Sequence, residues 1–265
     1  MSVSDAISGS AEQQAGPAVP APFRWQDGHL RADWPGGGVL FTTRRGGVSR
    51  GPYAELNLGG STRDDPRAVA ANRATAAALA GVGPDDLVRG QQVHGTRVQR
   101  DAAPAPFGAE LERADGQATT SRGAAVMVLT ADCLPVTLVA PGAVAVVHAG
   151  WRGLAAGVVQ AGVVGVRALG GDPVTAAIGP GAGGCCYEVG DEVRAAFAAT
   201  HDGAGLAGDR HVDLKAAARA RLAACSVAEI HDAGLCTICS DPALFFSHRR
   251  DAGVTGRQAG LAWRS

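Results

Sequence analysis

The sequence is short of aromatic residues and carries almost no net charge. Of its 265 residues 5% are aromatic, and 24 basic against 25 acidic residues leave a formal net charge of -1. With so few aromatic rings, the hydrophobic core must be built mainly from Ala, Val and Leu. Near neutrality argues against the broad basic surface with which proteins bind nucleic acids or anionic membranes. We therefore expect neither partner, and an anionic substrate would have to be bound at a local site.

The sequence also lacks signals for membrane insertion and secretion. No window reaches the roughly 18 apolar residues of a transmembrane helix. Residues 1–22 have neither the basic start nor the apolar stretch of a secretory signal, and their Ser, Ala, Gln, Gly and Pro content predicts a disordered tail. We expect a cytoplasmic protein in which this tail precedes one catalytic domain over residues 23–265.

Cysteines are too sparse for a disulfide scaffold. Six thiols in a chain of this length are expected, in a reducing cytosol, to be free, to bind metals or to act as nucleophiles. Cys236 and Cys239 form a Cys-x-x-Cys pair, but the sequence has no second such pair with which to complete a structural zinc site. We therefore predict that this pair does not bind a metal.

Hydrophobic runs and turn residues predict a mixture of strands and helices. Apolar runs at residues 125–130, 134–140 and 143–148 have the continuity of strands buried on both faces, and the short turns between them predict antiparallel neighbours. No internal repeat or long linker is present, so we expect a single α+β domain with helices outside sheets. Further strands are predicted at residues 39–43, 91–99, 174–178 and after Ile230, and helices at residues 66–80, 154–169, 191–200 and 213–224.

Three predicted strand ends each carry a potential metal ligand. These are His94, Cys133 and His148, and small Gly and Ala residues beside them leave room for a bound group. Two imidazoles and one thiolate suit zinc, and three protein ligands leave a fourth position for water or substrate, as in catalytic zinc sites. The spacings are long, so hydrogen-bonded structural residues would explain the same pattern.

Longer motifs around these residues resemble those of the YfiH-like family. The strings are Gln-Val-His-Gly (92–95), Ala-Asp-Cys-Leu-Pro (131–135), His-Ala-Gly-Trp-Arg-Gly (148–153) and Ile-Gly-Pro…Cys-Tyr-Glu-Val-Gly (178–190). Similar strings lie at residues 43–49, 56–59 and 245–251, so the resemblance extends from about Phe41 to the C-terminus. It implies a four-layer α/β/β/α sandwich with zinc held by His94, Cys133 and His148.

The resemblance also implies an activity. Members of the family are described as zinc-dependent purine nucleoside phosphorylases with adenosine deaminase activity. The expected reaction cleaves adenosine, and also inosine, guanosine or methylthioadenosine, with phosphate to give the purine base and ribose 1-phosphate. The expected partners are therefore two small molecules, a nucleoside and phosphate. The protein itself is expected to be a monomer or a homodimer.

Candidate phosphate ligands are arginines within the motifs. Phosphate needs cationic or amide donors, which Arg44, Arg152 and Arg249 could supply, with Arg44 first. The glycine-rich run at residues 178–184 could offer a nest of backbone N–H groups. The alternative roles are structural, since Arg152 could brace the helix that follows it.

Three further motif residues are assigned to the site. Asn57 could bond ribose or base, or form a turn, and Cys186 is expected to face the pocket. Asp132 could orient a metal ligand, carry a proton or pair with an arginine. We count Asp132 with Cys133 and the two histidines as the candidate catalytic residues.

Several other functions compete with this interpretation. Cys133 and His148 could act as nucleophile and base of a hydrolase or deamidase. Members of the family have also been described as copper polyphenol oxidases and as peptidoglycan editing factors. Seven histidines are few for a multicopper centre, and copper bound in vitro would prove little because copper outcompetes zinc at most nitrogen and sulfur sites. The zinc nucleobase deaminases use His-x-Glu with Pro-Cys-x-x-Cys, which this sequence lacks.

Overall fold

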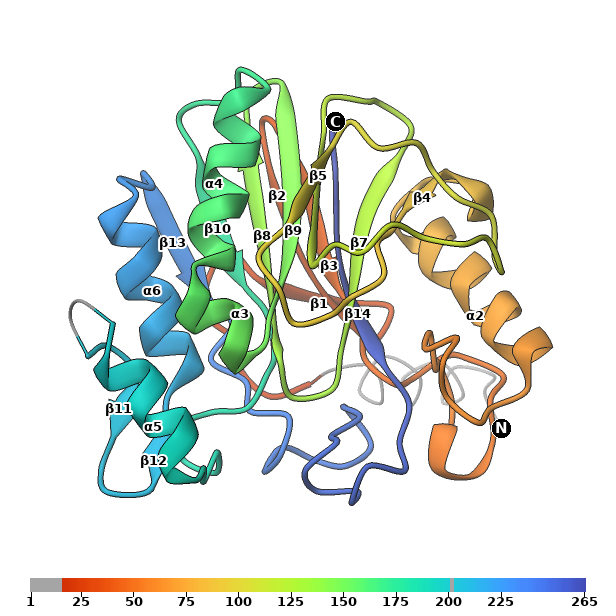
Figure 1. The fold of residues 1–265 in the computed structure, drawn as a ribbon. Helices are drawn as coiled ribbons and strands as arrows, with labels where there is room; N and C mark the ends of the chain where they lie inside the picture. The colour runs from red at the N-terminus through yellow and green to blue at the C-terminus, as the bar shows by residue number, and fades with distance from the viewer. Residues whose placement is uncertain (1–15, 201–202) are drawn as a thin grey trace, which may run out of the picture.

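The computed structural model describes residues 16–200 and 203–265, which form two packed six-stranded sheets between layers of helices (Figure 1). The first sheet has the order β1 (Arg24–Gln26), β2 (His29–Trp34), β3 (Gly37–Phe41), β14 (Gln258–Trp263), β7 (Ala125–Thr130) and β4 (Leu87–Val88). The second has the order β13 (Glu229–Asp232), β10 (Thr175–Ile178), β8 (Leu134–Ala140), β9 (Ala143–Ala149), β6 (Gly116–Thr119) and β5 (Val98–Arg100).

Helices cover the outer faces of both sheets. In Figure 1, α2 (Pro66–Leu79) lies on one side of the sheets, and α3 (Trp151–Ala156), α4 (Val158–Ala168) and α6 (Leu214–Ala224) lie on the other. This arrangement confirms the predicted α+β class and the α/β/β/α order of layers. The remaining elements are α5 (Asp191–Ala198), the hairpin of β11 (Leu206–Ala207) and β12 (His211–Val212), and the short 3-10 helices η1 (Gly51–Tyr53) and η2 (Pro84–Asp86).

Each pair of neighbouring layers encloses its own hydrophobic cluster. The cluster between the sheets contains Phe41, Val126 and Val146, whose side chains come from both sheets. Separate clusters fill the space between the first sheet and α2, and between the second sheet and α3, α4 and α6. Most of these side chains are Ala, Val and Leu, as the composition predicts, and a strand between two such clusters is apolar on both faces.

The predicted pairing of the three central strands is wrong in part. β8 and β9 form the expected antiparallel hairpin, with Leu134 opposite Ala149. β7 instead pairs with β14 and β4, so the turn at residues 131–133 carries the chain from one sheet to the other. A short turn permits either a hairpin or such a crossing, because both sheets bury both of their faces. Cys133 therefore lies where the two sheets meet.

Two other predicted elements differ in their extent from the prediction. Only β5 and an isolated bridge at Gln91 represent the strand predicted over residues 91–99, because much of that segment forms loops beside the site. The helix predicted over residues 154–169 begins at Trp151 and breaks between α3 and α4 at Gly157, where φ is 101°. That left-handed conformation favours glycine.

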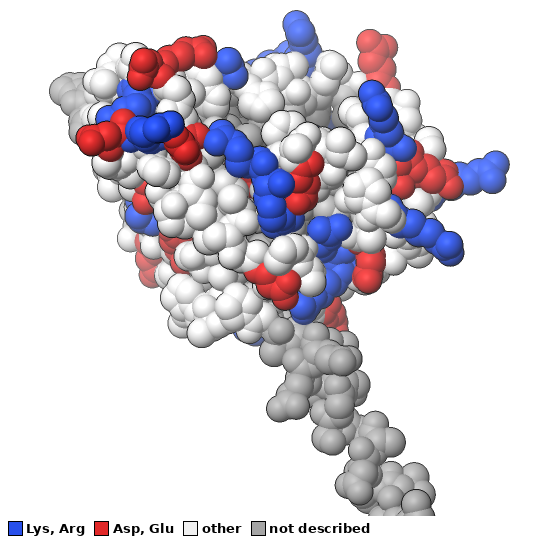
Figure 2. All heavy atoms as spheres, turned by 90° about the horizontal axis from the view of Figure 1, so that it is seen from below, with Lys and Arg blue, Asp and Glu red and all other residues white. Residues whose placement is uncertain are grey.

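The surface carries charges of both signs. Acidic and basic side chains are interspersed on the face seen from below in Figure 2, consistent with the small net charge. Among the described residues no helix is long and apolar enough to cross a membrane.

The expected N-terminal tail lies partly within the described range. Residues 16–22 are described, and there the Pro17 carbonyl accepts a hydrogen bond from the Trp25 indole at 2.8 Å. Residues 1–15 lie outside the described range.

Candidate active site

His94, Cys133 and His148 lie together although more than fifty residues separate the first from the last. One nitrogen of each imidazole and the Cys133 Sγ all lie within 4.8 Å of one another. The ring centroids of the two histidines are 4.9 Å apart in an edge-to-face arrangement. His148 comes from the end of β9, Cys133 from the crossing turn before β8, and His94 from the loop between β4 and β5. The predicted constellation therefore exists as a compact group of three donors.

Asp115 holds two of these segments in place. Its fully buried carboxylate accepts hydrogen bonds from the backbone N–H groups of Val93, His94 and Gly95 at 2.7–3.0 Å. The same carboxylate lies 2.8 Å from His148 Nδ1. A carboxylate on one imidazole nitrogen fixes the ring and leaves the other nitrogen facing the site, as in carboxylate–histidine–metal arrangements.

Cys133 and His148 shift each other's pKa in opposite directions. Burial by itself would raise the pKa of the Cys133 thiol, but the charge of His148 and hydrogen bonds from both histidines lower it to about 6. Burial would lower the pKa of His148, yet the charge of Cys133 and the bond to Asp115 raise it to about 9. Both shifts favour a thiolate beside an imidazolium, and the thiolate is the form that binds metals or attacks electrophiles.

Backbone geometry makes space at the centre of the site. A Cβ on Gly150 would lie 2.8 Å from His94 Cδ2 and 3.0 Å from Cys133 Sγ, so only glycine fits there. His94 and Asp132 have positive φ angles of 59° and 88°. Non-glycine residues in this region are strained, and such strain is commonly found where a side chain must be aimed for function.

The three donors line a cavity of about 820 Å³, large enough for a nucleoside and an anion. Two half-buried aromatic side chains, Trp151 and Tyr187, form part of its wall. Burial and the charge of Cys133 raise the pKa of Tyr187 to about 12, so its phenol is neutral near pH 7. The cavity is also lined by five arginines: Arg73, Arg89, Arg152, Arg249 and Arg257.

Comparison with known proteins identifies the family. The family model described as multi-copper polyphenol oxidoreductase laccase matches residues 38–265. A purine nucleoside phosphorylase from Streptomyces griseus is 46% identical over 84% of this chain and 92% of its own length. The crystal structure of YlmD from Geobacillus stearothermophilus has a TM-score of 0.83 at 34% identity, covering 92% of this chain and 99% of that one. The YfiH structure from Bacillus licheniformis has a TM-score of 0.81 at 30% identity, covering 93% and 100%.

The chain belongs to the YfiH-like family. The resemblance read from the sequence motifs is thereby confirmed, together with the fold that it implied.

Two of the phosphate-binding arginines predicted for this YfiH-like chain lie at the cavity. Arg152 is exposed, lies over the Trp151 ring at 4.1 Å and pairs loosely with Glu192 at 3.5 Å. Arg249 lies over the Tyr187 ring at 5.3 Å and donates a hydrogen bond to the Glu188 carbonyl. Both are available at the cavity wall, and their role in phosphate binding stays a prediction.

Three other predicted residues have structural partners instead. The Arg44 guanidinium donates to the carbonyls of Ala54 and Pro242, stacks on Phe246 and is not among the residues lining the cavity. Asn57 is fully buried, and its side-chain oxygen accepts from the N–H groups of Gly59 and Arg257. It thus braces two cavity loops, in line with its turn-forming alternative, and for both residues the geometry offers no support for a substrate contact.

The third, Cys186, points toward other thiols. Its Sγ lies 3.4 Å from Cys185 Sγ and it is absent from the cavity lining. The glycine-rich run that precedes it was expected to offer a phosphate nest, and its residues 178–184 are likewise absent from that lining.

Asp132 lines the cavity, and both of its oxygens have partners. Oδ1 accepts from the Thr237 hydroxyl at 2.6 Å, and Oδ2 accepts from the Arg249 backbone N–H at 2.7 Å. Asp132 therefore joins the crossing turn to the C-terminal segment, and the bond that orients a histidine ligand comes from Asp115 instead. Sequence reasoning missed Asp115; the one available signal was an acidic residue directly before the fully buried strand β6.

Proposed function

We propose that this chain is a zinc-dependent purine nucleoside phosphorylase that cleaves adenosine with phosphate. The observation that carries the proposal is the combination, in one cavity, of a three-donor metal constellation, two aromatic walls and several arginines. The naming of its curated relatives as purine nucleoside phosphorylases supports the substrate class. The same site is proposed to accept inosine, guanosine or methylthioadenosine.

The donor set fits a catalytic zinc ion. Two imidazole nitrogens and one thiolate are ligand types that zinc accepts, and Asp115 supplies the outer hydrogen bond that zinc-bound histidines normally make. His94, Cys133 and His148 would hold the ion at the cavity wall. When bound, zinc supplies a Lewis acid that polarises a substrate oxygen or nitrogen or activates water.

The chain's own residues would bind and orient the reactants. Arginines at the cavity wall, of which Arg152 and Arg249 are exposed, can bind the phosphate dianion with charge-assisted hydrogen bonds. A phosphate oxygen attacks ribose C1′, the bond from C1′ to the purine nitrogen breaks, and its electron pair leaves with the base, which takes up a proton. The arginines then also neutralise the charge of the product, ribose 1-phosphate.

The aromatic walls are suited to the purine. Trp151 and Tyr187 can contact the faces of a planar base, which accounts for an aromatic platform despite the low aromatic content. The Tyr187 phenol is neutral near pH 7, and burial raises its pKa further, so it can donate a hydrogen bond to the substrate. These two residues complete a site that the sequence motifs described only through the metal donors.

Adenosine deamination is the second activity that we propose for this site. Water attacks purine C6 and ammonia leaves, which gives inosine. The reaction needs the same nucleoside pocket and an activated water near the donors, so it competes with phosphorolysis for the same bound substrate. Its supporting observation is that all three donors line the cavity.

A second candidate function is a cysteine hydrolase. The specific observation in its favour is the series Cys133, His148 and Asp115, in which a low-pKa thiol adjoins an imidazole oriented by a carboxylate. A thiolate held by zinc is not free to attack, so metal content separates the two functions.

The test is chromatography of adenosine incubated with metal-analysed protein, with and without phosphate. We expect adenine and ribose 1-phosphate only when phosphate is present, inosine in both cases, and loss of all products in Cys133→Ser. The matched control is Cys225→Ser, which removes a half-buried thiol that does not line the cavity and is expected to keep activity. A metal-free wild-type protein whose Cys133 is alkylated selectively, without nucleoside turnover, would favour the hydrolase.

A further inference from the structure

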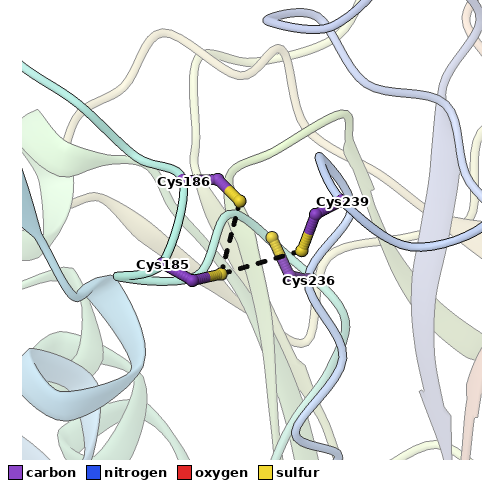
Figure 3. Close-up of side chains that lie close together, drawn as sticks. All are labelled: Cys185, Cys186, Cys236 and Cys239. Atoms are coloured by element: carbon purple, nitrogen blue, oxygen red, sulfur yellow. Dashed lines mark hydrogen bonds between the residues drawn. The ribbon is translucent and has the colours of Figure 1, made fainter.

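A second group of thiols lies away from the cavity. The Sγ atoms of Cys185, Cys186, Cys236 and Cys239 all lie within 4.8 Å of one another. Figure 3 shows that they come in two pairs from two chain segments and that the four sulfur atoms face a common centre. Sequence analysis predicted no metal at Cys236 and Cys239 because no second Cys-x-x-Cys exists, but the complementing pair consists of adjacent cysteines instead.

The sheet topology brings the two pairs together. β10 and β13 are parallel neighbours, so the segments that follow them leave the same edge of the second sheet. Their pairing continues past the strands through a bridge between Gly181 and Cys236, and Thr237 N–H donates to the Gly181 carbonyl at 3.1 Å. Each segment then places its two cysteines within the next few residues. The meeting of the thiols follows from the fold and not from a chance contact of surface loops.

The local backbone prepares Cys236 as an anionic ligand. The Gly183 N–H donates to its Sγ at 3.3 Å. A Cβ on Gly183 would lie 3.1 Å from Cys185 Sγ and 3.3 Å from Cys236 Cβ, so glycine permits the close approach of the two segments. Amide donors around a thiolate are the outer contacts that cysteine-ligated metals use.

A buried cation lies beside the group. Lys215, the only lysine of the sequence, is buried, and its Nζ donates to the carbonyl of Leu235, the residue before Cys236. A divalent metal ion coordinated by the four sulfur atoms would stabilise their deprotonated forms, which are the forms that bind metals.

The sulfur spacing distinguishes a metal site from disulfides. Sγ–Sγ distances are 3.7 Å for Cys185 and Cys239 and 3.4 Å for Cys185 and Cys186, against about 2.05 Å in a disulfide. Four sulfurs at about 2.3 Å from a tetrahedral zinc ion lie about 3.8 Å from one another. The observed spacing is close to the second arrangement.

We infer that Cys185, Cys186, Cys236 and Cys239 form a structural zinc site, separate from the catalytic constellation, with all four coordination positions filled by protein. This site would link the loop after β10 to the segment after β13. Both segments reach the cavity, since Tyr187 lines it and Thr237 donates to Asp132. A metal ion here would therefore stabilise the cavity wall without contacting substrate.

The experiment counts zinc ions per chain by mass spectrometry under non-denaturing conditions. We expect two ions for the wild type, one for Cys133→Ser, one for Cys239→Ser and none for the double variant. Cys225→Ser, which changes the cysteine outside both groups, should keep two. Cys239 is exposed, so its replacement by serine is compatible with folding, which circular dichroism checks.

Cobalt substitution in Cys133→Ser gives an independent measurement. Tetrahedral sulfur ligation predicts strong visible and near-ultraviolet absorption that Cys239→Ser abolishes in the same background. Equal zinc content in wild type and Cys239→Ser, or a Cys133→Ser protein without zinc under reducing conditions, would overturn the inference. A disulfide, detected by mass spectrometry as two of these cysteines that alkylation reaches only after reduction, would also overturn it. If Cys239→Ser loses a zinc ion and Cys133→Ser loses none, the result would contradict the proposed catalytic zinc site. It would still support the four-cysteine site.

Discussion

At the scale of single residues, the absence of a side chain at Gly150 is as important to the site as the donors around it. Replacing Gly150 by alanine would place a methyl group 2.8–3.0 Å from His94 and Cys133. We expect Gly150→Ala to lower zinc content at this site and to reduce nucleoside turnover, because the donors cannot keep their spacing.

The control for that change is Gly190→Ala. Gly190 has a φ of -80° and no atom near the position of an added Cβ, so alanine is expected to be tolerated. Metal analysis and turnover are compared for the two variants. Equal zinc content in both would show that the site adapts to the methyl group.

A second prediction concerns Asp115. In Asp115→Asn one oxygen becomes an NH₂ group that faces backbone donors, which we expect to lower the free energy of unfolding by about 1–3 kcal/mol. His148 also loses its carboxylate partner, so we expect the affinity of the site for zinc to fall roughly 10–100-fold. Competition with a chelator measures the affinity. The control is Asp101→Asn, which alters a carboxylate that accepts hydrogen bonds from Thr120 and should leave the zinc affinity unchanged.

Sequence reasoning found the donors and missed the residues that position them. His94, Cys133 and His148 stand out because their motifs are long and their chemistry is specific. Asp115 acts through backbone N–H groups of a segment twenty residues earlier in the chain, a contact that no local pattern reveals. The partner of Cys239 was missed for a similar reason, since adjacent cysteines distant in sequence replace the second Cys-x-x-Cys.

At the scale of elements, α2 shows how much a local pattern can predict. Asp65 caps its first turn by accepting from the Arg67 N–H at 2.8 Å, with Pro66 in the first position. We expect Asp65→Ala to lower the free energy of unfolding by about 1 kcal/mol, which corresponds to roughly 2–4 °C in the thermal midpoint. Asp65→Ser keeps a capping oxygen and should recover most of the loss. Calorimetry of both variants tests the assignment, and equal midpoints for alanine and wild type would contradict it.

Strand pairing was harder to predict than strand position. The runs that form β7, β8 and β9 were located to within a residue, because buried strands are continuous apolar segments. Which sheet each run joins depends on partners far along the chain, such as β14 for β7. The conformation of Asp132, at a φ of 88°, turns the chain across the sheets, and propensity alone gives no reason to expect it there.

At the scale of the whole molecule, one buried histidine makes stability depend on pH. Burial lowers the pKa of His29 to about 4 from an ordinary value of 6.5, and its Nδ1 accepts from the Thr43 N–H at 3.0 Å. The unfolded chain binds this proton at a higher pH than the folded chain does. The free energy of unfolding is therefore expected to fall as pH decreases from about 6.5 to about 4, by roughly 2 kcal/mol at pH 5.

Denaturant unfolding between pH 4 and 7 measures this dependence. His29→Gln can keep an acceptor for Thr43 but has no proton to bind, so its curve should be flatter than that of the wild type over this window. Parallel curves for the two proteins would assign the pH dependence to other groups.

The position of β14 has a consequence for biosynthesis. This strand follows every other strand in chain order, yet it lies inside the first sheet, between β3 and β7. While the ribosome is still translating the preceding residues, β3 and β7 have no partner between them, and their open edges can pair with other chains. The nascent polypeptide is thus most vulnerable to aggregation just before residues 258–263 emerge, and chaperones that shield strand edges would act in that interval.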